Sequence, residues 1–255
     1  MASVRRRFTD CRFGQLLIRE INPGIGTPLV CLHATAYSSQ SFLPLLMAYD
    51  DRRHVLAVDL PGYGDSDGPT EPVTIEEYAS AIAEGLPDGV VDIFGYHTGV
   101  VVAVELAIQQ PDRVKALVLM GVPYFRALDF AAWKARLAKP HRLLEGLAQF
   151  EERWQWLVTD RPAGMSLERG YANFVDELKA WPNGYWAHQS LFDYDCDARF
   201  ALVQQSVQIL NPDGHLAEPS RIAAGIFPHA QCLELPELAG AVLESGARRL
   251  AELIS

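Results

Sequence analysis

Four short runs of apolar and β-branched residues recur in the first half of the chain, and helical patterns separate them. The runs cover residues 28–34 (PLVCLHA), 54–60 (HVLAVDL), 89–95 (GVVDIFG) and 114–121 (VKALVLMG). Runs that are apolar on both faces are typical of a parallel sheet covered by helices. Helices are expected over residues 75–84, capped by Thr74, and over residues 98–110, ended by Pro111. This alternation predicts an α/β layered fold with right-handed crossovers.

The alternation stops after Val122. Residues 124–196 have helical periodicity without strand patterns, and all five tryptophans of the chain lie there. A helical insertion at this point is expected to cover the carboxyl edge of the sheet, with some of its rings lining an apolar pocket and most packing among themselves. We therefore predict one domain over residues 1–255 with a helical cap over residues 124–196. Strands are then expected over residues 207–210 and 231–235, and helices near residues 220–226 and 242–254.

The charge balance restricts the partners of this chain. Its formal net charge is −10, which disfavours binding to nucleic acid and to anionic membranes. The longest nearly uncharged stretch, residues 93–104, is too short to span a bilayer. The four cysteines form no CxxC pair and no zinc spacing, and no apolar segment of a secretory signal follows Arg7. These features favour a reduced, cytoplasmic protein.

Three local sequences carry a resemblance to a known family. Residues 59–66 (DLPGYGDS) are similar to the D-x-P-G-x-G-x-S turn of the α/β-hydrolase superfamily, and residues 31–35 (CLHAT) resemble its L-H-G-x loop. Residues 95–99 (GYHTG) lie between a strand and a helix, where the family has its G-x-S-x-G nucleophile elbow. The resemblance covers nearly the whole chain in order and spacing. It implies an α/β-hydrolase fold, a mostly parallel central sheet with flanking helices and a helical cap inserted after the sixth strand.

The chain departs from the family at its catalytic positions. His97 stands where the family has its nucleophile, and Gly240 stands where the resemblance places the catalytic histidine. The family's acid follows the seventh strand, so the alignment puts His215 at the acid position, while a slip of two residues gives Asp213. At least two of the three members of the Ser-His-Asp triad are therefore absent.

His97 is the strongest catalytic candidate, because neutral imidazole accepts and returns protons near pH 7 and histidine tolerates positive φ. The resemblance implies an oxyanion hole made by the backbone N–H groups of Thr35 and Thr98. Either His215 or Asp213 would orient His97 or relay its proton, unless both belong only to the Asn-Pro-Asp-Gly turn. A zinc site formed by His33, His97 and His215 is the less favoured alternative, since it has no carboxylate and no ligand spacing signature.

A second set of side chains is expected around the substrate: His33, Tyr96, Tyr124, Trp154, Trp186 and His188. Of these, His33 resembles the family histidine that supports the loop after the strand. His188 is either a second proton-transfer group or a hydrogen-bonding residue between cap helices. No glycine-rich nucleotide fingerprint follows the first strands, so no cofactor is implied.

These features predict an α/β-hydrolase-fold enzyme without the triad, in which His97 performs acid/base chemistry on a small hydrophobic carbonyl compound. The outcome would be ester or lactone hydrolysis, or a non-hydrolytic elimination, C–C cleavage or cyclisation. The alternative is a catalytically silent protein that binds a small ligand. Retention of the elbow glycines and of a titratable group at the elbow favours the enzyme. Assembly as a homodimer is left open.

Overall fold

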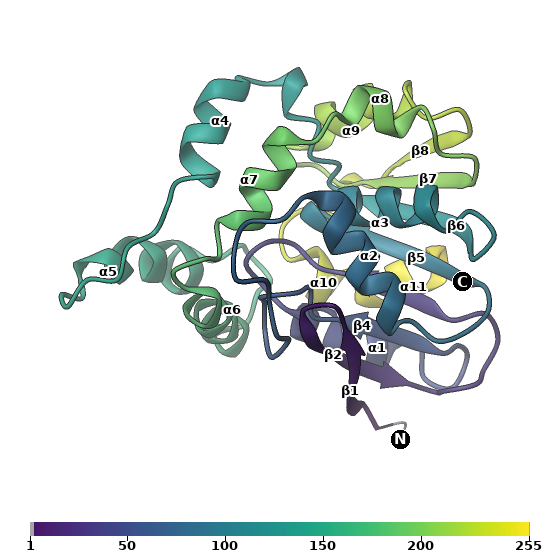
Figure 1. Cartoon of the computed structure of the whole chain (residues 1–255), viewed down its shortest axis with the longest axis horizontal. Helices are drawn as coiled ribbons and strands as arrows, with labels where there is room; N and C mark the ends of the chain where they lie inside the picture. The colour runs from purple at the N-terminus through teal and green to yellow at the C-terminus, as the bar shows by residue number, and fades with distance from the viewer. Residues whose placement is uncertain (1–2, 255) are drawn as a thin grey trace.

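The structure is a computed structural model that describes residues 3–254, and a sheet of eight strands forms its centre (Figure 1). The strands are β1 Arg5–Cys11, β2 Gly14–Ile21, β3 Leu29–Leu32, β4 Val55–Val58, β5 Val91–Tyr96, β6 Val114–Met120, β7 Ser206–Asn211 and β8 Ala230–Glu234. Their order in the sheet is β1-β2-β4-β3-β5-β6-β7-β8. Strand β2 is antiparallel to both of its neighbours, and all other pairs are parallel. The sheet is thus mostly parallel, as the sequence predicts.

Helices cover both faces of this sheet. The α-helices are α1 Leu43–Ala48, α2 Ile75–Gly85, α3 Thr98–Gln109, α4 Phe130–Leu137, α5 Ala148–Trp154, α6 Leu167–Ala180, α7 Trp186–Asp193, α8 Cys196–Phe200, α9 Ala217–Ala224, α10 Val242–Ser245 and α11 Ala247–Leu253. Short 3-10 helices are η1 Ser39–Phe42, η2 Phe125–Ala127 and η4 Pro236–Leu238, and η3 Gln155–Thr159 is a π-helix. One apolar core includes side chains of α2, α3 and α9, and a second core includes side chains of α1, α10 and α11.

The alternation of side chains along β3 shows why the strand is apolar on both faces. Val30 and Leu32 belong to the core beneath α2 and α3, whereas Leu29 and Cys31 belong to the core beneath α1 and α11. All four side chains are fully buried. A strand between two helical layers has no face left for polar residues.

The predicted elements are found with small shifts at their ends. Thr74 caps α2 through a capping box with Glu77, and α3 ends at Gln109, before Pro111. The helix predicted over residues 242–254 is divided into α10 and α11 at Gly246. The hairpin of β1 and β2 was not predicted, because residues 5–11 alternate between exposed and half-buried positions and lack an apolar run.

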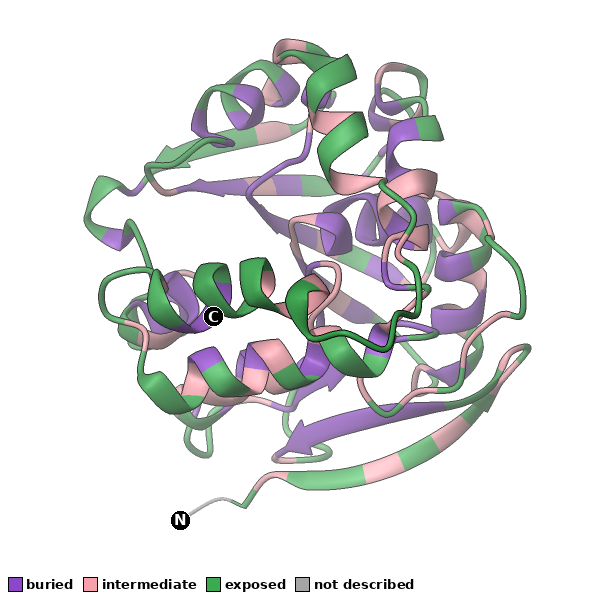
Figure 2. Ribbon diagram, turned by 90° about the vertical axis from the view of Figure 1, so that its left-hand side faces the viewer, coloured by how far each residue is buried: buried purple, intermediate pink, exposed green. Residues whose placement is uncertain are grey.

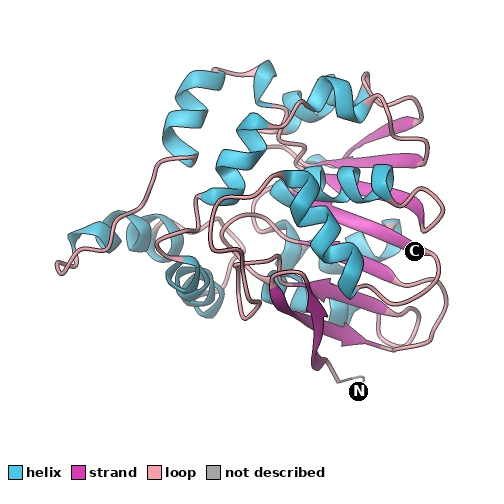
Figure 3. Ribbon diagram, viewed as in Figure 1, coloured by secondary structure: helices cyan, strands magenta, loops and turns pink. Residues whose placement is uncertain are grey.

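Every element described between β6 and β7 is a helix, in agreement with the periodicity of the sequence. We call residues 121–205 the helical segment. Figures 1 and 3 show that its helices α4 to α7 lie beyond the edge where the parallel strands end. Among residues 3–254, no helix is both long enough and apolar enough to cross a bilayer.

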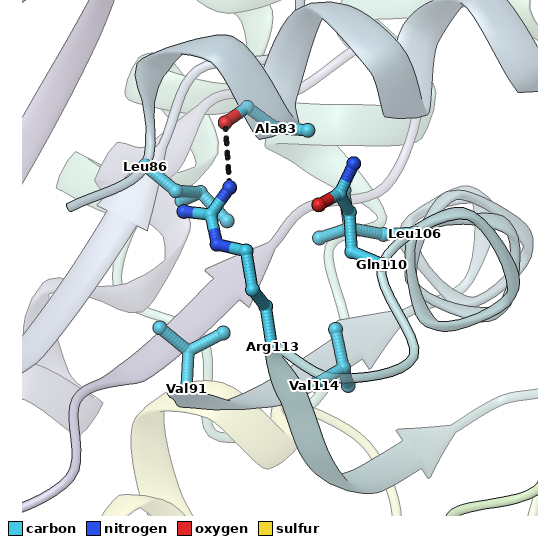
Figure 4. A pocket seen from close by; sticks show the side chains of 7 residues that line it. All are labelled: Ala83, Leu86, Val91, Leu106, Gln110, Arg113 and Val114. Carbon is cyan, nitrogen blue, oxygen red and sulfur yellow. Dashed lines mark hydrogen bonds between the residues drawn. The ribbon is translucent and has the colours of Figure 1, made fainter. Parts of the chain in front are cut away.

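At the opposite edge of the sheet, where the parallel strands begin, side chains fill the space between the strands and the helices. Figure 4 shows Arg113 extended between apolar side chains near the starts of β5 and β6. Its guanidinium donates hydrogen bonds to the carbonyl oxygens of Pro87, at 2.9 Å, and of Ala83, at 3.5 Å. Arg113 thus satisfies one carbonyl in the last turn of α2 and one in the loop after it, and its stem fills the space between the strands and α2. The amino edge therefore presents a structural contact, and the candidate site lies at the carboxyl edge.

Candidate active site

The sharp turn between β5 and α3 carries His97 at its tip. His97 has φ 50° and ψ −115°, and its N–H donates to the carbonyl of Met120 at 3.0 Å. A Cβ atom on Gly95 would lie 2.7 Å from the carbonyl oxygen of Gly99, and one on Gly99 would lie 2.0 Å from that of Leu32. Strand and helix therefore approach so closely that only glycine fits on either side of the histidine.

The ring of His97 lies against the end of β6. A Cβ atom added to Gly121, which has φ +66°, would lie 2.7 Å from Cδ2 and 2.8 Å from Nε2 of this ring. The Tyr96 ring packs on it with a centroid distance of 4.2 Å. His97 is only partly buried, and within residues 3–254 neither of its ring nitrogens has a hydrogen-bond partner. A polar group without a partner in the protein normally bonds to water. These nitrogens are therefore available to water or a ligand.

The surroundings of His97 keep its ring neutral. Removal from solvent lowers its pKa from 6.5 to about 3, and the neighbouring His215 and His188 lower it further in the same direction. Burial also lowers the pKa of His188, to about 4, and that of His215. The carboxyl edge of the sheet thus holds three imidazoles that are neutral at pH 7.

The loop after β3 meets the elbow through two hydroxyl groups. Thr35 donates a hydrogen bond from Oγ1 to Oγ1 of Thr98, at 2.8 Å. Thr98 is the first residue of α3, where backbone N–H groups have no partner within the helix and the helix dipole favours negative charge. In the part of the chain that the structure describes, the N–H groups of Thr35 and Thr98 have no hydrogen-bond acceptor. Both donors are therefore free to meet a ligand oxygen.

His33 supports the same loop through two hydrogen bonds of its ring. The N–H of Leu60 donates to Nε2 of His33 at 2.9 Å, so the proton is on Nδ1, which donates to the carbonyl of Ala34 at 2.9 Å. The ring is fully buried, and both of its nitrogens are occupied. This geometry favours the loop-supporting role over contact with a substrate.

Of the two residues expected near the acid position, the structure brings His215 to His97. Their ring centroids are 6.1 Å apart with an edge-to-face orientation, and His215 stacks on Trp133 at 5.3 Å. No hydrogen bond joins the two histidines among the described residues. Asp213 is exposed, and it makes no contact with His97 in this part of the chain. Of the two residues, His215 is therefore the one with a ring contact to His97.

The four remaining predicted side chains lie in different settings. His188 on α7 lies close enough to His97 to affect its pKa. The hydroxyl of Tyr124 donates to Asp197 at 2.6 Å. Trp154 on α5 packs on Tyr171 and Phe174 with centroid distances of 4.9 and 5.2 Å, so it stabilises the α5–α6 pair. Trp186 begins α7 and is partly buried.

Sequence patterns did not indicate three polar groups of this region. Burial raises the pKa of the Tyr37 phenol, and the nearby Glu177 adds to the shift while Arg153 opposes it. Nε of Arg153 on α5 donates to Glu177 on α6 at 2.7 Å, and Nη2 of Arg153 donates to the same carboxylate. Tyr96, which the sequence does indicate, is a further neutral phenol, with its pKa raised by burial to about 12. Of these three groups, only Tyr37 carries a usable sequence signal, since it comes two residues after Thr35 in the loop that follows β3.

The position expected for the catalytic base has a backbone conformation that suits glycine. Gly240 has φ +87°, and a Cβ atom there would lie 3.1 Å from the carbonyl oxygen of Ala163. A histidine would therefore be both strained and crowded. In residues 3–254, no three His, Cys, Asp or Glu side chains are grouped in a way that could hold a metal ion.

Comparison with curated proteins finds hydrolases that match part of this chain. A segment of 137 residues is 24% identical to (E)-2-((N-methylformamido)methylene)succinate hydrolase of Acinetobacter baylyi and covers 51% of each chain. A segment of 113 residues is 34% identical to pimeloyl-[acyl-carrier protein] methyl ester esterase of Shewanella woodyi and covers 43% of this chain and 42% of that one. The chain thus spans about half the length of the curated relatives it matches.

Solved structures match over nearly the whole chain. The enol-lactonase of Burkholderia xenovorans LB400 superimposes with a TM-score of 0.74 at 16% identity, covering 97% of this chain and 98% of that one. Cfl2 of Burkholderia cenocepacia gives a TM-score of 0.77 at 20% identity, covering 98% and 94%. At these identities the likeness shows the fold alone. The model of the alpha/beta hydrolase fold family matches residues 27–211, and the chain belongs to this family.

Proposed function

We propose that this protein is a cofactor-free enzyme in which His97 performs acid/base chemistry on a small hydrophobic carbonyl compound. The observation that carries the proposal is the partly exposed His97 ring at the elbow, whose nitrogens have no partner among the described residues. Thr35 and Thr98 would donate their N–H groups to the substrate oxygen, and residues 124–196 would cap the site. The four cysteines are all free, which suits a reducing cytoplasmic setting.

The low pKa of His97 couples proton transfer to charge formation on the substrate. A neutral ring with a pKa of about 3 holds a proton poorly while the site is empty. When negative charge develops on a carbonyl oxygen beside the ring, the imidazolium becomes more favourable, since an opposite charge stabilises the charged form. In hydrolysis, His97 would take a proton from the attacking water as its oxygen bonds to the carbonyl carbon and the oxyanion forms. It would return this proton to the leaving oxygen as the oxyanion collapses and the ester or lactone C–O bond breaks, while His215 and His188 stay neutral.

The expected rate limits the substrate class. Oxyanion donors and binding leave roughly 10³–10⁴-fold acceleration over water without a triad, and a positioned base adds about 10²–10⁴-fold. This suffices for activated esters, lactones and thioesters, or for removal of an acidic proton next to a carbonyl that leads to elimination, C–C cleavage or cyclisation. Amides are too unreactive. The names of the matched relatives, a methyl ester esterase and a succinate-derivative hydrolase, support a carbonyl substrate.

A substrate panel with a matched pair of variants tests the proposal. Activated esters, lactones and thioesters are assayed with the parent protein, with His97→Asn and with His229→Asn, a histidine that is exposed just before β8. We expect His97→Asn to lose at least about 100-fold in kcat/KM and His229→Asn to keep the parent value. Equal activity of all three proteins would remove His97 from the mechanism. Ligand binding by calorimetry without turnover of any substrate would instead favour the ligand-binding protein.

A further inference from the structure

Arg136 on α4 is a cation without an acidic partner. Its guanidinium carbon lies over the ring of Trp133, one turn earlier on α4, at 5.5 Å from the centroid, and over the ring of Trp156 in η3, at 5.4 Å. Within residues 3–254, Arg136 forms no hydrogen bond and no ion pair. Cation–π contacts thus hold the guanidinium, while its five N–H groups are free to donate to a ligand.

Ring contacts connect Arg136 to the candidate site. The indole of Trp133 stacks on His215 with an interplanar angle of 14°, and His215 in turn lies edge-to-face on His97. Helix α4 also packs against α7, which carries His188 (Figure 1). The guanidinium therefore lies next to the site, and two rings connect it to His97.

The charge of Arg136 acts on this site without opposition from a carboxylate. Burial lowers the pKa of His215, and the positive charge of Arg136 adds to this shift. Besides burial, the groups that lower the pKa of His97 are His215 and His188. Among the described residues, no carboxylate contributes to the pKa shift of His97 or His215. An anionic group beside His215 would therefore meet a positive charge, although the net charge of the chain is −10.

We infer that Arg136 binds a carboxylate of the substrate, so that the compound reacting at His97 carries a free carboxylate apart from its reacting carbonyl. This inference rests on the proposed function and specifies its substrate class. The planar fork of a guanidinium matches the two oxygens of a carboxylate. One guanidinium also balances the single charge of a carboxylate, whereas a phosphate monoester carries nearly two charges. Because Arg136 is connected to His97 through two rings, several bonds should separate the carboxylate from the reacting carbonyl.

The p-nitrophenyl half-esters of adipic and suberic acid test this specificity. Each half-ester carries a free carboxylate, and the matching p-nitrophenyl methyl diester does not. We expect the parent protein to have the higher kcat/KM for the half-esters. Arg136→Met keeps an apolar stem without the charge, and it should lower the ratio of kcat/KM for half-ester over diester by about 10-fold or more.

Arg142→Met is the matched control for this ratio. Arg142 is an exposed arginine of the same helical segment, and its side chain has no ring contact and no ion pair among the described residues. Its variant should keep the parent ratio. A parent protein without preference for the half-esters, or an unchanged ratio in Arg136→Met, would overturn the carboxylate site and leave the role of His97 untouched.

Calorimetry separates the carboxylate site from the proposed function. Monomethyl adipate and dimethyl adipate are titrated into the parent protein, Arg136→Met and Arg136→Lys. The Kd of monomethyl adipate should rise about 10-fold in Arg136→Met and by a smaller factor in Arg136→Lys, since an ammonium group keeps the charge but not the planar fork. Such binding without hydrolysis of any ester would refute the acid/base chemistry of His97 and still support the carboxylate site.

Two results of the same titrations would contradict the inference. One is a parent protein that binds monomethyl adipate no more tightly than dimethyl adipate. The other is an Arg136→Met variant with a lower Tm and an unchanged Kd for monomethyl adipate, which would show that Arg136 only joins α4 to η3.

Discussion

The sheet and the helical segment are held together in different ways. In β3 every side chain is fully buried, whereas α4 and α5 contain no buried residue. Helix α6 buries only Gly170, Asn173, Asp176 and Ala180, which are small or polar. Figure 2, which looks onto the helical segment, shows exposed residues along its helices and buried residues in the strands behind them. Apolar packing stabilises the sheet, whereas the buried residues of α6 are small or polar.

Individual contacts of α6 confirm this difference. Ser38 donates to Asp176 at 2.7 Å, Lys179 pairs with Asp65 at 2.5 Å, and Arg169 pairs with Glu244 at 2.8 Å. The strength of ion pairs and of hydrogen bonds to carboxyl groups changes with pH and salt, whereas that of apolar contacts depends on neither protonation nor charge screening. The attachment of the helical segment should therefore respond to pH, and the sheet should not.

The largest expected effect comes from removing a ring beneath the sheet. Phe94 on β5 is fully buried and contacts Phe42, so Phe94→Ala should lower the free energy of unfolding by about 3–5 kcal/mol. Val175→Ala on the outer face of α6, where the residue is 47% exposed, should change it by about 0.5 kcal/mol or less. Urea denaturation measures both. Similar losses for the two variants would show that the helical segment is packed as tightly as the sheet.

This difference also explains what the sequence could predict of the fold. The strands were recognised because burial on both faces leaves an apolar run, and Thr74 and Pro111 mark helix ends by local chemistry. The position of α6 could not be predicted, because Ser38 and Asp176 are 138 residues apart and neither residue type indicates its partner. Edge strand β1 was missed for a related reason, since it has no fully buried residue.

Asp176 provides the next test, because burial raises its pKa from 3.8 to about 6. The folded state then binds a proton that the unfolded state releases, so this group destabilises the protein as pH rises from about 4 to 6. Asp176→Asn removes the ionisation and keeps an acceptor for Ser38. Relative to the parent, the variant should gain about 3 kcal/mol of stability at about pH 8 and little at about pH 4.

The measurement is the difference in unfolding free energy between variant and parent at each pH, which cancels the titration of other groups. Asp65→Asn is the control, since that exposed partner of Lys179 has a lowered pKa and should show the opposite sign. A pH-independent difference for Asp176→Asn would mean that the pKa of Asp176 is the same in the folded and the unfolded protein.

The candidate site also has one part that could be predicted from the sequence and another part that could not. The elbow was predictable because Gly95, His97 and Gly99 follow one another in the sequence and the close approach of strand and helix dictates their spacing. Tyr37 and the Arg153–Glu177 pair could not be predicted, because only the packing of α5 and α6 brings Arg153 and Glu177 together near Tyr37. Local backbone constraints are visible in a sequence, while polar contacts between distant helices are not.

His97 should show a pH effect of intermediate size. Its pKa falls from 6.5 in the unfolded chain to about 3 in the folded protein, so the unfolded state binds the proton first as pH decreases. This destabilises the folded protein below about pH 6.5, by about 2 kcal/mol at pH 5. His97→Asn should abolish that part of the pH dependence. Ring NMR signals of ¹⁵N-labelled histidine check it directly, and a His97 ring that titrates near pH 6.5 would contradict the neutral, desolvated imidazole.

The smallest expected effect concerns Gly240, at the position that the resemblance assigns to the catalytic histidine. Gly240→Ala should cost about 1–2 kcal/mol, because its φ of +87° is unfavourable for any side chain. For the same reason, His97→Ser combined with Gly240→His should not gain p-nitrophenyl acetate hydrolysis, since the imidazole would be strained and crowded by Ala163. Hydrolysis well above that of the parent would show that this loop adapts to a histidine. The conformation of Gly240 is thus unfavourable for a histidine at the position that the resemblance assigns to the base, and the mechanism proposed above relies on His97 instead.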